Sequence, residues 1–318
     1  MTSTALTQEA IRFAENNFQM MVNAELLGSK VLNFLLKNRI EFKPGNIDNA
    51  MFVSRVEKNT GTVGTIDANG VPTGVDFMET RTPYEETKSF TQLATVATIK
   101  MHNIPELQAL ANTLATSSNA EMVAQAFRNL SFANIIQNEM TSKLINEIRD
   151  RLTSFLIASE SATIYGSDTM FSASAGTLWA GINKISGTFS ETTFKEQFYR
   201  QAIQKDVNGV VVGSDGGLDT IFVENAKYYD VTALINPEMS SNVDSRIMIP
   251  KADVIPLTLT TSDCFALGKN HGLRFISDTP FPIVFMKEDE NGNMLIHARW
   301  NVAFVWVHRL DAFMYNNA

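Results

Sequence analysis

The sequence has little cysteine, little proline and no long apolar run, and these shortages exclude several classes of protein. The single cysteine, Cys264, excludes an intrachain disulfide framework and fits synthesis in a reducing cytosol. No run of about 18 apolar residues exists, so no transmembrane helix and no membrane partner are expected. The N-terminus lacks the basic start and apolar core of a secretory signal, so we expect no signal peptide.

Basic residues are also in short supply. The chain has 26 basic and 34 acidic residues, for a net charge of −8. A protein that coats nucleic acid carries a basic footprint, so this balance argues against that function, although it allows a wall that merely encloses nucleic acid. The hydrophobic share of 44% is typical of a folded protein, and 318 residues predict two domains or one large elongated domain.

The residue patterns of known catalytic and metal sites are missing too. No G-x-S-x-G nucleophile elbow occurs, and Cys264 lies in an apolar strand, as a buried small hydrophobe does. The histidines have no metal-ligand spacing such as H-E-x-x-H; they are His102, His271, His297 and His308. We therefore predict no catalytic, cofactor-binding or metal-binding residues, no cofactor, and a protein that is not an enzyme.

Two glycine-containing loops imitate ligand sites. The loop at 213–217 follows a valine run like a phosphate loop, but a strand-like segment follows it, so no helix N-terminus meets a phosphate. The acidic run at 288–293 resembles half of a calcium loop, yet it lacks the alternating ligands and the bidentate glutamate. Asn291–Gly292 predicts a hairpin turn there instead.

The chain is organised around a long helix predicted at about 118–160. Ser118 and Glu121 fit a capping box, and no glycine or proline follows before Gly166. Apolar residues recur at steps of three and four; among them are Met140, Leu144, Ile148, Leu152 and Leu156. An unbroken helix would be roughly 60 Å long, which suits an architectural protein, and a kink into two ordinary helices is the alternative.

Residues 7–38 also predict a helix, which Gly28 ends or bends. This helix is either an ordinary amphipathic one packed on the core or an arm that docks on a neighbouring subunit. Residues 50–98 then predict a long two-stranded ribbon with Asn69–Gly70 in its turn. A two-stranded ribbon is not stable alone in water, so it is either a flexible surface loop or an arm that reaches over an adjacent copy. The predicted intersubunit contact residues are Arg55, Glu57, Lys58, Arg81, Glu85, Glu86 and Lys88.

The C-terminal half predicts helices near 190–206 and 225–234 and several strands, which end in an unusually long one from 294 to about 310. Along this last strand one face is apolar throughout, whereas the other becomes apolar only from Ala303 onward. That period of two is typical of a half-buried strand, which would be some 50 Å long. The fold class is therefore α+β.

The order of these elements resembles tailed-bacteriophage major capsid proteins of the Hong Kong 97 type. The local likeness is strongest from Ile148 through Tyr165 to Ile182, and again from Arg299 to Phe313. The resemblance implies a fold with an N-terminal arm, an extended loop, a long spine helix, a peripheral domain and an axial domain. The implied boundaries are 1–43 for the arm and helix, 44–98 for the loop, 99–165 for the peripheral domain with the spine, 166–270 for the axial domain, 271–307 for the peripheral long β-hairpin and 308–318 for the return to the axial domain.

The resemblance implies a shell protein that forms hexamers and pentamers of an icosahedral head around packaged double-stranded DNA, which it contacts non-specifically. Synthesis in the host cytoplasm and residence in the virion follow, and separate scaffolding, portal and decoration proteins are further partners. An encapsulin-like nanocompartment that houses a cargo enzyme has the same fold and is the alternative. An enzyme on an elongated α+β scaffold is a third hypothesis, which the missing site residues disfavour.

Overall fold

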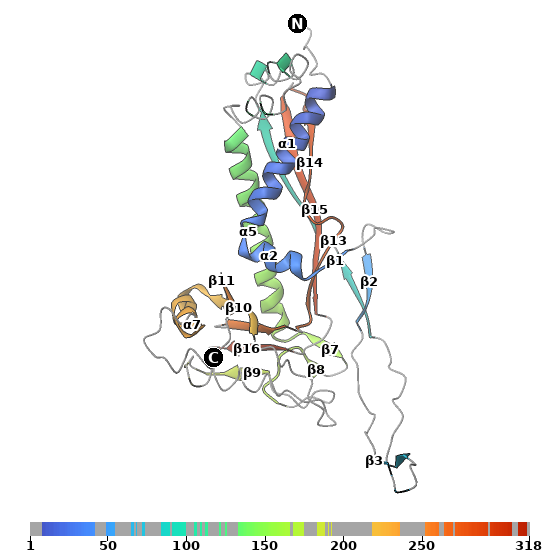
Figure 1. Cartoon of the computed structure of the whole chain (residues 1–318), viewed down its shortest axis with the longest axis vertical. Helices are drawn as coiled ribbons and strands as arrows, with labels where there is room; N and C mark the ends of the chain where they lie inside the picture. Colours follow the sequence, from blue (N-terminus) through green and yellow to red (C-terminus); the bar gives the residue numbers. More distant parts are fainter. Residues whose placement is uncertain are drawn as a thin grey trace. The chain divides into compact units, whose positions relative to one another are not determined.

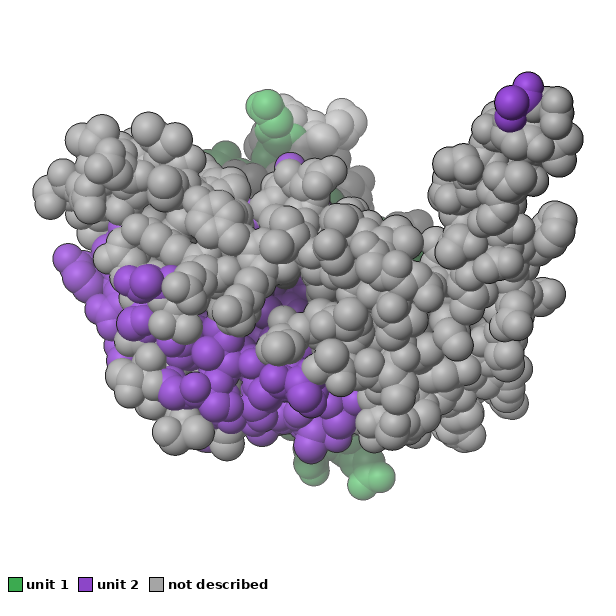
Figure 2. Space-filling view, turned by 90° about the horizontal axis from the view of Figure 1, so that it is seen from below, with its two compact units in different colours: residues 1–48, 89–149, 275–303 green, residues 49–88, 150–274, 304–318 purple. Residues whose placement is uncertain are grey.

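The chain divides into two compact units in the computed structural model. Unit 1 comprises residues 1–48, 89–149 and 275–303, and unit 2 comprises 49–88, 150–274 and 304–318. The described residues of unit 2 are coloured purple in Figure 2. The structure describes residues 8–41, 49–54, 65–66, 68, 72–73, 84–89, 91–99, 105–106, 109, 112–113, 121, 125, 133–165, 168–174, 183–187, 190, 192, 218–235, 252–260, 264–269, 271–291, 293–306 and 311–316.

Two helices begin unit 1, α1 (Gln8–Leu27) and α2 (Lys30–Lys37). The predicted helix over 7–38 is thus confirmed, with the predicted break at Gly28. A Cβ added to Gly28 would lie 3.2 Å from the Glu25 carbonyl oxygen, which favours glycine at this tight junction. One stripe of α1, with residues four apart, is buried; it consists of Ala14, Phe18, Val22 and Leu26.

The long helix α5 (Ala133–Ser159) belongs to unit 1 up to Arg149 and to unit 2 from Asp150. Its buried side chains are the predicted apolar stripe of Met140, Leu144, Ile148, Leu152 and Leu156. Glu139, Lys143 and Glu147 are exposed, as expected of the opposite face. The predicted start at Ser118 lies outside the described residues.

The sheet of unit 1 has the strand order β1-β13-β15-β14, with β6 also paired to β15. Figure 1 shows α1 running along β14, and the two are in contact. The strand β6, which the sequence places at the end of the extended loop, pairs antiparallel with β15 from Thr91↔Val302 to Ile99↔Met294. The strands are β1 (Arg39–Glu41), β6 (Thr91–Ile99), β13 (Leu273–Ser277), β14 (Ile283–Glu288) and β15 (Met294–Trp306).

The predicted long strand is β15, and its alternating pattern is confirmed. Its fully apolar face is buried, and the other face is half-buried or exposed up to Asn301 and buried from Ala303 onward. Trp300 fixes the buried face, because its indole N–H donates a 2.8 Å hydrogen bond to the Thr279 carbonyl oxygen and its ring meets Phe275 edge-on at 5.4 Å. β14 and β15 pair antiparallel, so the predicted hairpin turn at 288–293 connects them.

In the part of the chain that the structure describes, three short strand pairs lie outside the two main sheets. In the predicted ribbon, β2 (Asn49–Ser54) pairs with β5 (Tyr84–Ser89). Further along, β3 (Thr65–Ile66) pairs antiparallel with β4 (Pro72–Thr73), and these two strands bracket the predicted Asn69–Gly70 turn. Beyond α5, β7 (Thr163–Tyr165) pairs antiparallel with β8 (Asp168–Thr169).

The sheet of unit 2 has the order β11-β10-β12-β16-β9. A short 3₁₀ turn (Asn225–Lys227) and helix α7 (Tyr228–Ile235) follow β10, where the sequence predicts a helix. The predicted helix over 190–206 lies almost entirely outside the described residues. The strands are β9 (Lys184–Ser186), β10 (Leu218–Glu224), β11 (Asp253–Leu257), β12 (Cys264–Gly268) and β16 (Ala312–Asn316).

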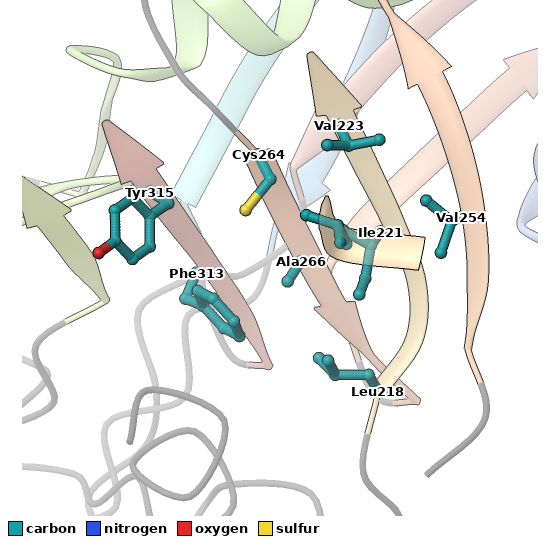
Figure 3. Packing of buried hydrophobic residues seen from close by; sticks show 9 residues of the cluster. Leu218, Ile221, Val223, Val254, Cys264, Ala266, Phe313 and Tyr315 are labelled. Atoms are coloured by element: carbon teal, nitrogen blue, oxygen red, sulfur yellow. The ribbon is translucent and has the colours of Figure 1, made fainter. Parts of the chain in front are cut away.

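Side chains from four strands form one buried layer on this sheet (Figure 3). The strand register aligns Val254, Ile221, Ala266 and Phe313 in a row across β11, β10, β12 and β16. Burying such side chains stabilises the fold by about 1.5–3 kcal/mol each before entropy costs. Cys264 lies in the same layer and is fully buried, as the sequence predicts.

The opposite face of the same sheet is buried under aromatic side chains. Phe171 packs edge-on against Phe265 at 5.3 Å and against Trp306 at 5.8 Å. The indole N–H of Trp306 donates a 2.7 Å hydrogen bond to the Ser159 hydroxyl at the end of α5. The sheet of unit 2 is therefore covered on both faces.

Candidate functional site

The predicted contact residues of the ribbon fall into two groups. Arg55, Glu57, Lys58 and Arg81 lie outside the described residues. Glu85, Glu86 and Lys88 belong to β5, whose backbone pairs with β2. Their role as intersubunit contacts therefore stays a prediction.

Large apolar side chains remain exposed in both units, and in unit 1 two of them lie side by side in β14. Ile283 is 49% exposed and Phe285 is 37% exposed, whereas Val284 between them is buried. Across the ladder Ile283 pairs with Arg299, Phe285 with His297 and Lys287 with Leu295. These six residues, none of them fully buried, form what we call the open face of the sheet.

Aromatic stacking organises the open face. The Phe285 ring lies parallel to the His297 imidazole, with centroids 4.8 Å apart and planes 7° apart. Within the described part of the chain, Nε2 of His297 is buried and has no hydrogen-bond partner. Exposed apolar side chains such as Ile283 and Phe285 are suited to contact with another macromolecule.

Further exposed apolar side chains lie on helices. In unit 1, α1 exposes Met20 and Leu27, 68% and 48% exposed. In unit 2, α7 exposes Tyr228 and Tyr229, the second of them 68% exposed. Tyrosine is enriched in the contact regions of protein interfaces because it combines a large apolar ring with a polar hydroxyl.

The acidic hairpin turn satisfies its own hydrogen bonds. Asp289 Oδ1 accepts from the backbone N–H groups of Asn291 and Asn293, both at 2.8 Å, and Oδ2 accepts from the Asn293 side-chain amide at 3.0 Å. These bonds, that from the Asn293 side chain above all, lower the pKa of Asp289 because they stabilise the carboxylate. The prediction of a hairpin turn rather than a calcium loop is confirmed.

Other chemically active side chains are buried in packing positions. Cys264 and His271 are both inside unit 2. Among the described residues, no three histidine, cysteine, aspartate or glutamate side chains are grouped as a metal site requires. No described helix combines the length and the apolar character needed to span a membrane.

Comparisons with known proteins place the fold. No protein-family model and no curated protein matches the sequence. A protein of known structure does match: the virus-like particle from Pyrococcus furiosus, with a TM-score of 0.50, over 97% of this chain and 100% of that one. This chain shares the fold of that particle. The two sequences are 10% identical, so the likeness is one of fold alone.

A cyanophage capsid and the capsid of a GTA particle also resemble the chain, more weakly. The capsid of cyanophage P-SCSP1u has a TM-score of 0.46 at 10% identity and matches 89% of this chain and 86% of its own. The capsid of the native GTA particle has a TM-score of 0.46 at 11% identity, with 100% and 94% covered. The fold shared with the virus-like particle confirms the mixed helix-and-sheet fold that the sequence predicts.

The open face is the surface that the sequence analysis missed. The pattern at 281–286 predicts a strand, but it is apolar at consecutive positions, so it does not reveal which side faces the core. The useful signal is the pairing register, because it places Ile283 and Phe285 opposite Arg299 and His297, the more polar face of β15. The turn at Asp289 sets that register, and the residues of this turn can be recognised in the sequence.

Proposed function

We propose that the chain is the major capsid protein of an icosahedral head, assembling into pentamers and hexamers around packaged double-stranded DNA. The observation that carries the proposal is the fold shared with the Pyrococcus furiosus virus-like particle over nearly the full length of both chains. The exposed apolar side chains in both units add support, because association would remove them from water. On this proposal the protein is a structural component, made in the host cytoplasm and retained in the virion.

The same proposal assigns roles to the regions. Residues 99–165 and 271–307 would form the peripheral domain, 166–270 the axial domain at the capsomer centre, and 308–318 the return to it. Residues 1–43 would form the arm, and the loop at 44–98 would overlap a neighbouring subunit. Contacts between different surface patches of neighbouring subunits produce rings, such as pentamers and hexamers, when the repeated rotation returns to the first subunit.

An encapsulin-like nanocompartment is the second candidate. The observation that favours it is that the matched structure is described as a virus-like particle, and a shell fold by itself does not specify the contents. The contents therefore distinguish the two functions.

The deciding experiment is electron microscopy of the expressed protein, followed by analysis of the particles isolated from the native source. Closed shells with nuclease-resistant double-stranded DNA support the capsid function. Shells with a copurifying enzyme and no DNA favour the nanocompartment. A protein that stays monomeric at every concentration, in solution and in its source, contradicts both.

The ribbon has a separate test. Deletion of residues 61–74 should leave both units folded, by circular dichroism, but should yield shells that dissociate at lower denaturant concentration, because the overlap with the neighbour is shortened. Deleting a ribbon tip removes little buried surface from its own subunit, since two-stranded ribbons have no core. Shells of normal stability would refute the role of the ribbon. Denatured particles should run as single subunits on a gel, because no covalent crosslink between subunits is expected.

A further inference from the structure

The strand β14 ends the sheet of unit 1, and its outer edge is occupied by a helix. In the described part of the chain, β14 pairs with β15 on one side and with no strand on the other. Successive backbone N–H groups of a strand point to opposite edges, so those of every second residue face away from the partner strand. On β14 the outward N–H groups include those of Val284 and Met286, and both are bonded to side chains of α1.

The side chain of Gln19 imitates a peptide group of a neighbouring strand. Its Oε1 accepts a 2.8 Å hydrogen bond from the Val284 N–H, and its Nε2 donates a 2.7 Å bond to the Pro282 carbonyl oxygen. One carboxamide thus satisfies a donor and an acceptor on either side of Ile283, as a backbone peptide of a paired strand would. Asn23 holds the carboxamide in place, because its Oδ1 accepts a 2.8 Å bond from the same Nε2.

Glu15 covers the next outward donor. Its Oε1 accepts a 2.8 Å hydrogen bond from the Met286 N–H. Glu15 and Gln19 are four residues apart on α1, and the groups they bind are two residues apart on β14. Residues four apart lie on one face of a helix and residues two apart lie on one edge of a strand, so α1 and β14 run side by side in opposite directions.

This edge would be adhesive if it were uncovered. Unpaired N–H and C=O groups of an edge strand are a template for pairing with another chain, above all where the strand is apolar. The sequence from Ile283 to Met286 is entirely apolar, and Ile283 and Phe285 are already exposed on the open face. Lysine or proline often protects an edge strand; here Pro282 and Lys287 flank this apolar run but none lies within it.

We propose that α1 guards the β14 edge: the side chains of Glu15 and Gln19 take the hydrogen-bonding positions through which β14 would otherwise pair with β14 of a second copy. Identical edges pair most simply antiparallel around a two-fold axis, which gives a closed dimer. Such a dimer differs from the ring contacts of a shell, so the guard keeps subunits from associating in the wrong way. The proposal rests on unit 1 alone and holds whether or not the protein forms shells.

The test removes the two guarding side chains and detects whether the β14 strands of two copies lie next to each other. Ile283→Cys places a thiol on the exposed side of the strand, and the natural Cys264 is buried and does not compete. This probe is made in the otherwise unchanged chain and in Glu15→Ala/Gln19→Ala, and each is treated with a short bis-maleimide crosslinker at several protein concentrations. We expect the largest rise in crosslinked dimer, severalfold and growing with concentration, where both guarding side chains are missing.

The matched control is Asn16→Ala/Met20→Ala, which truncates two exposed side chains on the solvent side of the same helix. It should crosslink as the unchanged chain does. Glu15→Gln keeps an oxygen for the Met286 N–H and should also crosslink at the unchanged level. Equal crosslinking in the control and the double variant, together with faster amide exchange at Val284 and Met286, overturns the proposal, because the donors would then be free and yet unused.

If the double variant does not fold, the single variant Gln19→Ala answers the same question, since it uncovers Val284 and Pro282 while Glu15 remains. We expect an intermediate level of dimer from it. Adding Lys in place of Phe285 on the uncovered edge should abolish that dimer, because a charge on the strand opposes its pairing with an identical copy. Dimer that persists in Gln19→Ala/Phe285→Lys contradicts pairing through β14.

Discussion

The sheets of the two units are finished in different ways. In unit 2, every residue of β12 is buried, and apolar layers cover both faces of the sheet. In unit 1, β14 and the first half of β15 are buried on one face only, and the open face carries Ile283 and Phe285 in water. The difference teaches that unit 2 derives its stability from a complete core of its own, whereas unit 1 keeps a surface available for contact.

The same contrast holds for polar groups. In unit 2 the buried Asn183 side chain joins three segments: Oδ1 accepts from the Ser172 N–H at 2.8 Å, and Nδ2 donates to the carbonyl oxygens of Met170 and Ala312 at 2.8 and 3.2 Å. Unit 1 uses comparable side-chain bonds at its edge, on β14. Polar side chains thus connect the interior of one unit and cover the border of the other.

The largest expected effect is a difference in the free energy of unfolding between matched phenylalanine substitutions in the two sheets. Phe265→Ala in unit 2 should lower the free energy of unfolding by about 3–5 kcal/mol, because a fully buried ring leaves a cavity. Phe285→Ala on the open face of unit 1 is the matched control and should change it by less than about 1 kcal/mol. Urea denaturation followed by circular dichroism measures both, and equal losses would refute the contrast.

A smaller effect is expected from Asn183→Ala. The substitution deprives the Ser172 N–H and the Met170 carbonyl oxygen of the Asn183 side chain, at a cost of about 1–3 kcal/mol for each group that stays buried and unsatisfied. Asn225→Ala is the control, since Asn225 is exposed and gives one 3.2 Å bond to the Thr258 hydroxyl. Denaturant midpoints that coincide for the two variants would show that Asn183 does not hold its segments together.

The smallest effect concerns pH and the turn of unit 1. Since the pKa of Asp289 is lowered in the folded chain, its carboxylate stabilises the turn above the unfolded pKa of about 3.9. That contribution is lost as the pH falls through the folded value. Amide exchange at Asn291 and Asn293, corrected for intrinsic rates, should therefore rise at acid pH in the unchanged chain and should be high at neutral pH in Asp289→Ala. Protection that is equal in both chains at neutral pH would contradict this role.

Elements with a strong period were predictable from sequence. The stripe from Met140 to Leu156, the break at Gly28 and the alternation along β15 all follow from the spacing of apolar residues. The local chemistry of turns was equally readable, since Asn291–Gly292 predicts the hairpin between β14 and β15. In each of these cases the decisive residues are neighbours in the chain, so the physical cause is visible in a short window.

Pairing between distant segments was not predictable. β6 ends at Ile99 and β15 begins at Met294, so more than half of the chain lies between them, and nothing in either strand selects the other in advance. The final strand β16 was also not predicted from the sequence. Asp311, directly before β16, has a φ of 54°, and residues 312–315 pair antiparallel with β12. The side-chain cap by Gln19 depends on a tertiary contact, and helical spacing alone gives no sign of it.

The cap on β14 also limits how long such an edge can be. Four residues of helix advance about 6 Å, whereas two residues of strand advance about 6.8 Å. Side chains at successive helical turns are therefore spaced more closely than the backbone N–H donors they bind, by close to 1 Å at each step. Two such hydrogen bonds fit within the reach of flexible Glu and Gln side chains. On a much longer strand, the N–H donors would lie beyond the reach of side chains from a straight helix. Lengthening β14 by evolution or by design would require a bend in α1, or a second helix, to keep the added N–H donors hydrogen-bonded.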